Sequence, residues 1–459
     1  MSHSQPIQLS LPEVFTALSY ALDITEGQPR GHSVRCCWIG IHIGKELSLN
    51  KEELWELYYT LLLKDAGCSS NAARLFQLYG TDDRQTKKNF KHVDSHKLLQ
   101  VVNFIMANTS LSEGRLAQIK RIIYFIQHGK QLTTELIQTR CERGANITRR
   151  LGFSEQVARG VMHLDEHYNG EGRPQGLKGQ DIPLYARIAL LAQVADVFHQ
   201  IGGSKEALRE VHSRSGTWFD PQLVQAITKV AQEEQFWDIL KNELVEQAIA
   251  ALEPKDMTIT VNEEYLDTIA QAFADIIDAK SPFTFGHSRR VAAYSDIMAE
   301  HLGIDQDRRR WFHRGALLHD IGKLGVSNAV LDKPGKLTDD EYAQIKEHAR
   351  YTEEILSKIS IFKELAQIAA AHHERLDGKG YHKGLKGESI CLLTRILTVA
   401  DIFDALSAKR PYRDAMPLEK VFSILEEMRG TAVDGRCVDA LKARMPEVLA
   451  VMQQEKRKV

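Results

Sequence analysis

Cysteine, long apolar runs and net charge are all scarce in this chain, and each scarcity excludes a class of protein. The six cysteines among 459 residues show no C-x-x-C spacing and are too sparse for a disulfide framework. No segment approaches roughly 18 consecutive apolar residues, and residues 1–11 lack the basic and apolar pattern of a signal peptide. We therefore expect a cytoplasmic protein with no membrane span.

Opposite charges nearly cancel along the sequence. The 59 lysines and arginines face 61 acidic residues, which leaves a formal net charge of −2. A chain with this balance has no global positive field to draw it onto polymeric nucleic acid, so any recognition of phosphate must be local. The length suffices for two or three domains that each bury a core.

The spacing of apolar residues predicts an all-α fold. Apolar side chains recur every three to four positions along residues 291–302 and 345–359, and no alternating run indicates an extensive sheet. Asp339 is expected to begin a helix that carries His348, and Gly303 to end the helix that starts before residue 291.

Seven residues with metal-binding side chains follow one another through the C-terminal half. They are His287, His319, Asp320, His348, His372, His373 and Asp401. Imidazole nitrogen and carboxylate oxygen suit iron, manganese or zinc, and a carboxylate can bridge two ions whereas a lone imidazole cannot. This set predicts a metallohydrolase with a site for two divalent transition-metal ions.

These residues, the glycine-containing segment 372–385 and the Arg-Pro-Tyr-Arg sequence at 410–413 resemble the HD-GYP subgroup of the HD phosphohydrolases. Members of that subgroup are bacterial phosphodiesterases that linearise cyclic dinucleotides. The resemblance covers roughly residues 280–430 and departs from the signature at His382, which replaces its proline. Branches with a third metal have glutamate where this chain has Phe283, so the resemblance implies two ions.

The resemblance also implies a role for each site residue. One ion would be held by His287, His319, Asp320 and Asp401, and the other by Asp320, His348, His372 and His373. Asp320 and Lys323 would be catalytic, with Lys323 binding the scissile phosphate or stabilising the leaving oxygen. Gly380, Tyr381, Arg410 and Arg413 would bind substrate, since arginine forks match phosphate and guanine edges. For Gly380, a purely structural role in closing the loop remains an alternative to substrate binding. For Lys323, Arg410 and Arg413, the alternative is an ordinary position on the surface with no specific function.

The N-terminal half repeats the motifs in degraded form. Asp65 follows His32 by 33 positions, as Asp320 follows His287. The later tripeptide that ends at Asp196 matches the one that ends at Asp401. From the first Asp to the glycine of the loop, the halves span 105 and 58 positions, which indicates an insertion of about 47 residues between 79 and 130.

Most ligand positions of this first copy carry other side chains. Lys64 stands for His319, Arg140 for His348, and Leu164 and Asp165 for His372 and His373. Fixed cations repel metal ions. We therefore expect two tandem HD-domain helical bundles, a catalytically silent unit at 1–250 and an active phosphodiesterase at 260–459.

The predicted reaction opens a cyclic dinucleotide, 3',3'-cyclic GMP-AMP and/or cyclic di-GMP, to a linear 5'-phosphorylated dinucleotide. The alternative is a signalling adaptor without catalysis that binds a cyclic dinucleotide or protein partners through both units. A nucleoside-monophosphate phosphohydrolase of the broader HD group is disfavoured by the glycine-containing loop. Partnership with a second copy of the chain or with a signalling protein stays open.

Overall fold

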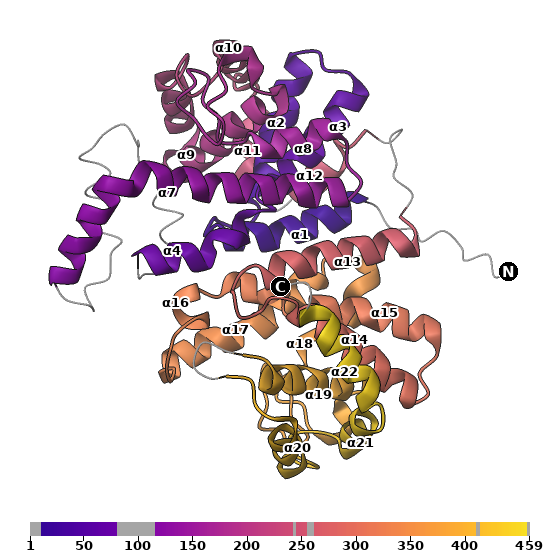
Figure 1. The fold of residues 1–459 in the computed structure, drawn as a ribbon. Helices are drawn as coiled ribbons and strands as arrows, with labels where there is room; N and C mark the ends of the chain where they lie inside the picture. The colour runs from indigo at the N-terminus through magenta and orange to yellow at the C-terminus, as the bar shows by residue number, and fades with distance from the viewer. Residues whose placement is uncertain (1–10, 80–114, 242–244, 255–260, 410–413, 457–459) are drawn as a thin grey trace. The chain divides into compact units, whose positions relative to one another are not determined.

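The protein forms helices and, within the residues described, no strand, which confirms the all-α prediction (Figure 1). The computed structural model describes residues 11–79, 115–241, 245–254, 261–409 and 414–456. The chain divides into two compact units, Met1–Val261 and Asn262–Val459. Across the described ranges, no helix combines the length and the apolarity needed to cross a membrane.

The first unit is built around α2, which packs against α1, α3, α9, α10 and α12. Its helices are α1 (Leu11–Thr25), α2 (His32–Glu46), α3 (Lys51–Leu63), α4 (Ala72–Tyr79), α7 (Arg115–Arg150), α8 (Glu155–Met162), α9 (Leu184–Ser213), α10 (Pro221–Val230), α11 (Glu234–Asp238) and α12 (Val245–Ala250). Short 3₁₀ turns follow at Cys68–Asn71, Gly179–Asp181 and Ile239–Lys241. Cys36, Ile39 and Ile43 of α2 are fully buried in its core.

The second unit repeats this arrangement around α14, which packs against α13, α15, α19, α21 and α22. Its helices are α13 (Glu263–Asp278), α14 (His287–His301), α15 (Gln306–Leu318), α16 (Asn328–Leu331), α17 (Asp339–Leu356), α18 (Lys363–Ala370), α19 (Leu392–Ser407), α20 (Leu418–Glu427), α21 (Gly435–Ala443) and α22 (Met445–Lys456). Short 3₁₀ turns lie at Ile321–Gly325, Ser360–Phe362 and Gly387–Ser389.

Local sequence signals explain where the site-bearing helices begin and end. The Thr338 hydroxyl accepts from the backbone of Glu341, whose carboxylate accepts from the backbone of Thr338, and this capping box starts α17 at Asp339 as predicted. The helix α14 ends at His301, and Gly303 follows with φ +80°. A left-handed residue just past a helix end favours glycine, so this predicted end is also confirmed.

The insertion of the first unit lengthens α7. This helix runs 36 residues, whereas its counterpart α17 runs 18 residues. Figure 1 shows α7 as the long helix of the first unit, and it packs there against α8. The segment 80–114, where the rest of the insertion falls, lies outside the described residues.

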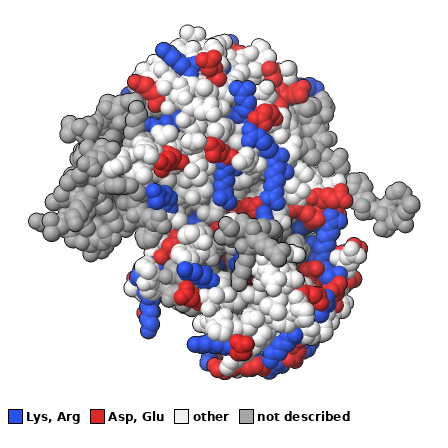
Figure 2. All heavy atoms as spheres, viewed as in Figure 1, with Lys and Arg blue, Asp and Glu red and all other residues white. Residues whose placement is uncertain are grey.

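Charges of both signs are mixed on the surface. On the face that Figure 2 presents, blue and red groups are interspersed over each unit. This agrees with the near-zero net charge of the chain.

Candidate metal centre

The second unit brings all seven predicted metal-ligand residues together. His287 begins α14, His319 and Asp320 follow α15, His348 lies on α17, His372 and His373 follow α18, and Asp401 lies on α19. Their ligand atoms form three overlapping groups within which all atoms lie within 4.8 Å of one another. Six of these side chains are buried, and His373 is half-buried.

Asp320 lies at the middle of the cluster with its two carboxylate oxygens on different histidines. Its Oδ2 is 3.3 Å from Nε2 of His287 and 3.4 Å from Nε2 of His319. Its Oδ1 is 3.5 Å from Nε2 of His348 and 3.7 Å from Nε2 of His372. Asp401 Oδ1 lies 3.3 Å from Nε2 of His287, on the first of these sides. This is the arrangement that a carboxylate shared by two cations requires.

The histidines present their Nε2 atoms because their Nδ1 atoms are already used. Nδ1 of His319, His348 and His372 lies 2.7, 2.6 and 2.5 Å from the backbone oxygens of Ala316, Ile345 and Ala369. A carbonyl oxygen only accepts, so each Nδ1 carries the proton and each Nε2 offers a lone pair to the centre. This pattern is typical of metal-binding histidines.

The protonation of these groups favours cation binding. Burial lowers the pKa of His348 to about 4 and that of His373 to about 3, so both rings are neutral near pH 7. Burial alone would raise the pKa of Asp320, but Lys323 and His319 hold it well below its ordinary value. The centre therefore combines neutral imidazoles at His348 and His373 with ionised carboxylate, whereas the carboxylates of Asp320, Asp401 and Asp404 outweigh burial and raise the pKa of His287 to about 10.

The residues fit a metal on a second, independent ground. Nε2 of His287, Nε2 of His319 and Oδ1 of Asp320 are buried and have no hydrogen-bond partner among the described residues. Buried polar atoms without partners are rare in folded proteins because each costs free energy. Their convergence indicates that a cation completes the site.

Lys323 stands at the edge of the cluster. It lies in the 3₁₀ turn Ile321–Gly325, and its ammonium donates to Oδ2 of Asp320. Its side chain keeps 19% of its surface exposed, so the amine lies between the buried carboxylate and solvent. This placement puts the ammonium at the candidate centre, where the catalytic role predicted for Lys323 would require it.

The glycine-containing loop is held by one buried carboxylate that the sequence interpretation missed. Glu374 accepts hydrogen bonds from the backbone N–H groups of Lys383, Gly384 and Leu385 at 2.6, 3.0 and 3.0 Å. A Cβ on Gly380 would lie 2.5 Å from the Cα of Glu374. Gly380 is therefore required for close packing of the loop against the segment that carries His373, whatever its role toward substrate.

The same loop places Tyr381 against the centre. Its ring centroid lies 4.8 Å from that of His373 at an angle of 31°. The following residue, His382, has its Nε2 2.7 Å from Oε2 of Glu353 on α17. This contact anchors the loop to α17 at the residue that replaces the proline of the signature.

Three further residues support the ligands without touching the centre. Asp404 Oδ2 lies 2.7 Å from Nδ1 of His287. Thr352 and Thr398 donate to the backbone oxygens of His319 and His372 at 3.0 and 2.8 Å. Asp404 could have been found in the sequence as an acidic residue one helical turn after Asp401. The threonines carry no such signal. Arg410 and Arg413 lie outside the described residues.

The HD domain family profile matches residues 103–223 and 271–437, which together exceed half of the chain. The chain belongs to the HD domain family. It is 52% identical over 432 residues to 3'3'-cGAMP-specific phosphodiesterase 3 of Vibrio cholerae, covering 94% of each chain. It is 38% identical over 205 residues to the cyclic di-GMP phosphodiesterase response regulator RpfG of Xanthomonas campestris, covering 44% of this chain and 54% of that one.

A solved structure shows the same likeness. The crystal structure of a cyclic GMP-AMP specific phosphodiesterase of V. cholerae aligns with a TM-score of 0.67 at 48% identity, covering 95% of this chain and 97% of that chain. These findings confirm the predicted resemblance to the HD phosphohydrolases.

The first HD unit places cations where the second HD unit has histidines. A Cβ on Gly67 would lie 1.9 Å from the Arg140 backbone oxygen, just as one on Gly322 would lie 1.9 Å from that of His348. This places Arg140 opposite His348, as the sequence indicated. Lys64 pairs with Asp65, and Arg140 pairs with Asp165. Despite burial, Asp65 and neighbouring groups hold the pKa of Lys64 above its ordinary value, so its charge persists.

The predicted match of Asp196 to Asp401 is wrong. Asp196 accepts from His32 Nδ1 at 2.7 Å and from Arg35 Nε at 2.6 Å, and these are the contacts of Asp404 with His287 and with the corresponding arginine of α14. The repeated Val-Ala-Asp tripeptide is therefore displaced by three residues, about one helical turn. When Asp196 is aligned with Asp404, Gln193 aligns with Asp401. The first HD unit therefore lacks the carboxylate that Asp401 offers in the second.

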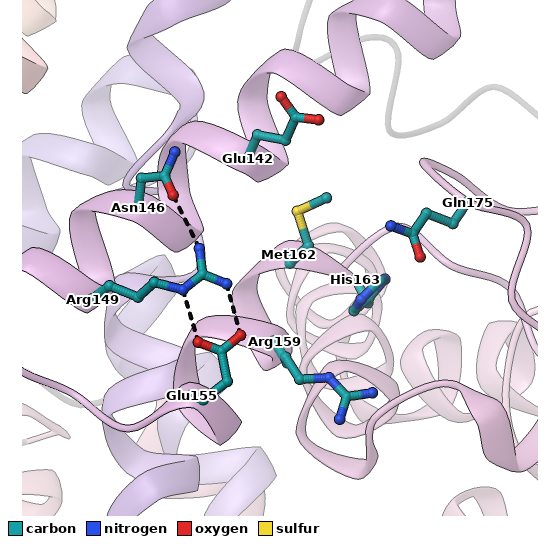
Figure 3. Close-up of a pocket in the computed structure, with 8 residues that line it drawn as sticks. All are labelled: Glu142, Asn146, Arg149, Glu155, Arg159, Met162, His163 and Gln175. Atoms are coloured by element: carbon teal, nitrogen blue, oxygen red, sulfur yellow. Dashed lines mark hydrogen bonds and ion pairs between the residues drawn. The ribbon is translucent and has the colours of Figure 1, made fainter.

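A hollow of about 460 Å³ opens on the first HD unit beside α7 and α8 (Figure 3). It is lined by Glu142, Asn146, Arg149, Glu155, Arg159, Met162, His163 and Gln175. The Arg149 guanidinium is neutralised there by two hydrogen bonds to the carboxylate of Glu155, at 2.8 and 2.7 Å. The buried Lys64 and Asp65 and the half-buried Arg140 are not among the lining residues.

Proposed function

We propose that the second HD unit hydrolyses a cyclic dinucleotide, 3',3'-cyclic GMP-AMP and/or cyclic di-GMP, to a linear 5'-phosphorylated dinucleotide. The observation that carries this proposal is the Asp320 carboxylate, whose two oxygens each face a separate pair of histidines. The names of the relatives support the substrate class, and the relative with 52% identity favours cyclic GMP-AMP.

The ligand set suits two divalent ions of iron, manganese or zinc. His287, His319, Asp320 and Asp401 would hold one ion, and Asp320, His348, His372 and His373 the other. Such ions supply an acidified water as nucleophile and neutralise charge on the phosphate oxygens. The buried surroundings exclude bulk water and strengthen every charge interaction within the site.

The chain itself contributes orientation and a mobile positive charge. The backbone oxygens behind three of the histidines and Asp404 behind His287 fix the ring orientations that catalysis needs. Lys323 lies at the solvent edge of Asp320, where its ammonium can turn to the scissile phosphate or to the leaving oxygen. We assign both Asp320 and Lys323 to catalysis.

The first HD unit is proposed to be catalytically silent. Lys64 and Arg140 supply fixed positive charge in place of two imidazoles, and Gln193 replaces a ligand carboxylate. Ion pairs therefore involve residues that align with the candidate ligands of the second HD unit. The cytoplasmic location stays a prediction from the sequence.

The full-length protein is expected to carry about two transition-metal ions per chain, measured by elemental analysis after removal of free metal. Asp401→Ala should lower that content because one side of the centre loses its carboxylate. Gln193→Ala changes the matching position of the first HD unit and should leave the content unchanged. Loss of metal in Gln193→Ala would contradict the assignment of all metal to the second HD unit.

Guanine-containing cyclic dinucleotides are expected to be the best substrates. An arginine fork matches the two acceptors on a guanine edge better than the donor and acceptor of adenine. We therefore expect kcat/KM for cyclic di-GMP and 3',3'-cyclic GMP-AMP to exceed that for cyclic di-AMP. If Arg410 reads guanine, Arg410→Ala narrows this difference, whereas a purely phosphate-binding Arg410 slows all three substrates alike.

Turnover and binding measurements with the same three substrates distinguish a phosphodiesterase from an adaptor. Metal-dependent turnover of any of the three substrates supports the phosphodiesterase. Binding of a cyclic dinucleotide without turnover, at full metal content, would instead support an adaptor. Faster turnover of cyclic di-AMP than of the two guanine-containing substrates would contradict the predicted preference for guanine. It would not contradict the proposed metal mechanism.

A further inference from the structure

An aromatic and cationic shelf lies beside the metal centre on α17 and the glycine-containing loop. It consists of Tyr342, Lys346 and Tyr381. The Lys346 ammonium lies 4.5 Å from the ring centroid of Tyr342 and 5.5 Å from that of Tyr381. The ring centroids of the two tyrosines lie 6.4 Å apart. Tyr381 in turn packs on His373, so the shelf runs outward from the ligands.

Lys346 differs from the neighbouring lysines in having no ion pair with a described residue. Lys323 is paired with Asp320, and Lys383 is paired with Glu353. Its ammonium lies against the two tyrosine rings, and the side chain is half-buried. An ammonium without a carboxylate partner near a metal centre is available to an anionic ligand.

Tyr342 is a large aromatic side chain that the fold leaves open. It keeps 46% of its surface exposed, whereas Tyr294 of the same unit is fully buried. An aromatic face of this kind offers a stacking surface to a nucleobase, and such stacking tolerates every base.

The proposed substrate needs these two features. A cyclic dinucleotide carries two phosphodiesters, and only one of them is cleaved at the metal centre. The second phosphodiester and the bases must then be bound beside the centre, by a cation and by aromatic faces.

We propose that Lys346 binds the phosphodiester that is not cleaved and that Tyr342 stacks on a base of the same substrate, while Tyr381 forms the inner end of the shelf against His373. This inference rests on the proposed function and names two substrate-binding residues that the motifs do not contain. The structural alternative is that Tyr342 and Lys346 form an i,i+4 pair that only stabilises α17.

Two substrates distinguish these explanations. In the full-length protein, Lys346→Ala should lower kcat/KM for 3',3'-cyclic GMP-AMP at least tenfold, mainly by raising KM. Hydrolysis of bis(p-nitrophenyl) phosphate, which has one phosphodiester and no nucleobase, should change less than twofold. Tyr342→Ala should lower kcat/KM for the dinucleotide several-fold, and Tyr342→Phe should retain it because the stacking face remains.

Lys420→Ala is the matched control, since Lys420 is exposed on α20 and the substitution removes the same charge. Lys420→Ala should hydrolyse both substrates at the rates of the unchanged protein. Equal losses on both substrates in Lys346→Ala would show an effect on His348 or on α17 and overturn the proposal. Unchanged dinucleotide turnover in Lys346→Ala overturns it as well. Failure of the unchanged protein to hydrolyse any cyclic dinucleotide would instead refute the proposed function, and this inference with it.

Discussion

Asp320→Ala is expected to abolish hydrolysis of cyclic dinucleotides, with kcat lowered roughly a thousandfold or more. A catalytic metal supplies several kcal/mol of transition-state stabilisation, and about 1.4 kcal/mol corresponds to a tenfold change in rate. Asp320 contributes an oxygen to each side of the centre, so its loss should weaken the binding of both proposed ions. Product chromatography measures turnover, and circular dichroism should show that helical content is retained.

The control for this experiment is a carboxylate of the same unit outside the centre. Asp439 of α21 is exposed and pairs only with Arg429 among the contacts described here, so Asp439→Ala removes a charge of the same sign without touching a ligand. Its turnover should stay within about twofold of the unchanged protein. Normal turnover in a folded Asp320→Ala protein would exclude the dinuclear mechanism.

Asp65→Ala, at the matching position of the first HD unit, is expected to lower the stability of the protein and to leave its turnover nearly unchanged. Lys64 is fully buried and pairs with Asp65, so the substitution leaves an uncompensated buried cation. Breaking a buried pair in this way costs about 3–5 kcal/mol. The midpoint of thermal unfolding should fall by on the order of 10 °C, followed by calorimetry. Turnover per folded chain should be nearly unchanged.

A double variant tests whether the pair itself is responsible. Lys64→Met together with Asp65→Ala removes both charges and should recover part of the lost stability, because no isolated buried cation remains. Thermal stability that is unaffected in Asp65→Ala would show that other groups neutralise Lys64. A large loss of turnover in Asp65→Ala at full folding would contradict the silent role of the first HD unit.

The comparison of the two units shows why one residue was mismatched from sequence. Asp196 and Asp401 end identical tripeptides on matching helices, and identity of letters favoured pairing them. The contacts of Asp196 instead match those of Asp404, one turn further along. A helix repeats every 3.6 residues, so a shift of three residues keeps a side chain on nearly the same face. Only the identity of its partner decides the register.

Residues whose side chains hydrogen-bond to backbone groups also could not be predicted from the motif. Glu374 follows the two histidines directly, yet nothing in its letter indicates that it accepts from the N–H groups of three residues nine to eleven positions later. Likewise Thr352 receives its role only because α17 brings it to the turn after His319. Such contacts depend on how the loop returns to the helix.

The sequence by itself determined the helical class, the seven candidate ligand residues and the replacement of most of them in the first unit. These features are local in origin, because helical periodicity and the chemical type of a side chain are visible in the letters. Tertiary structure alone decided that Asp320 divides its oxygens between two pairs of histidines, and that Lys346 lies against the rings of Tyr342 and Tyr381 with no ion pair to a described residue. These relations join residues from separate helices, and their distances follow from the packing of one helix on another.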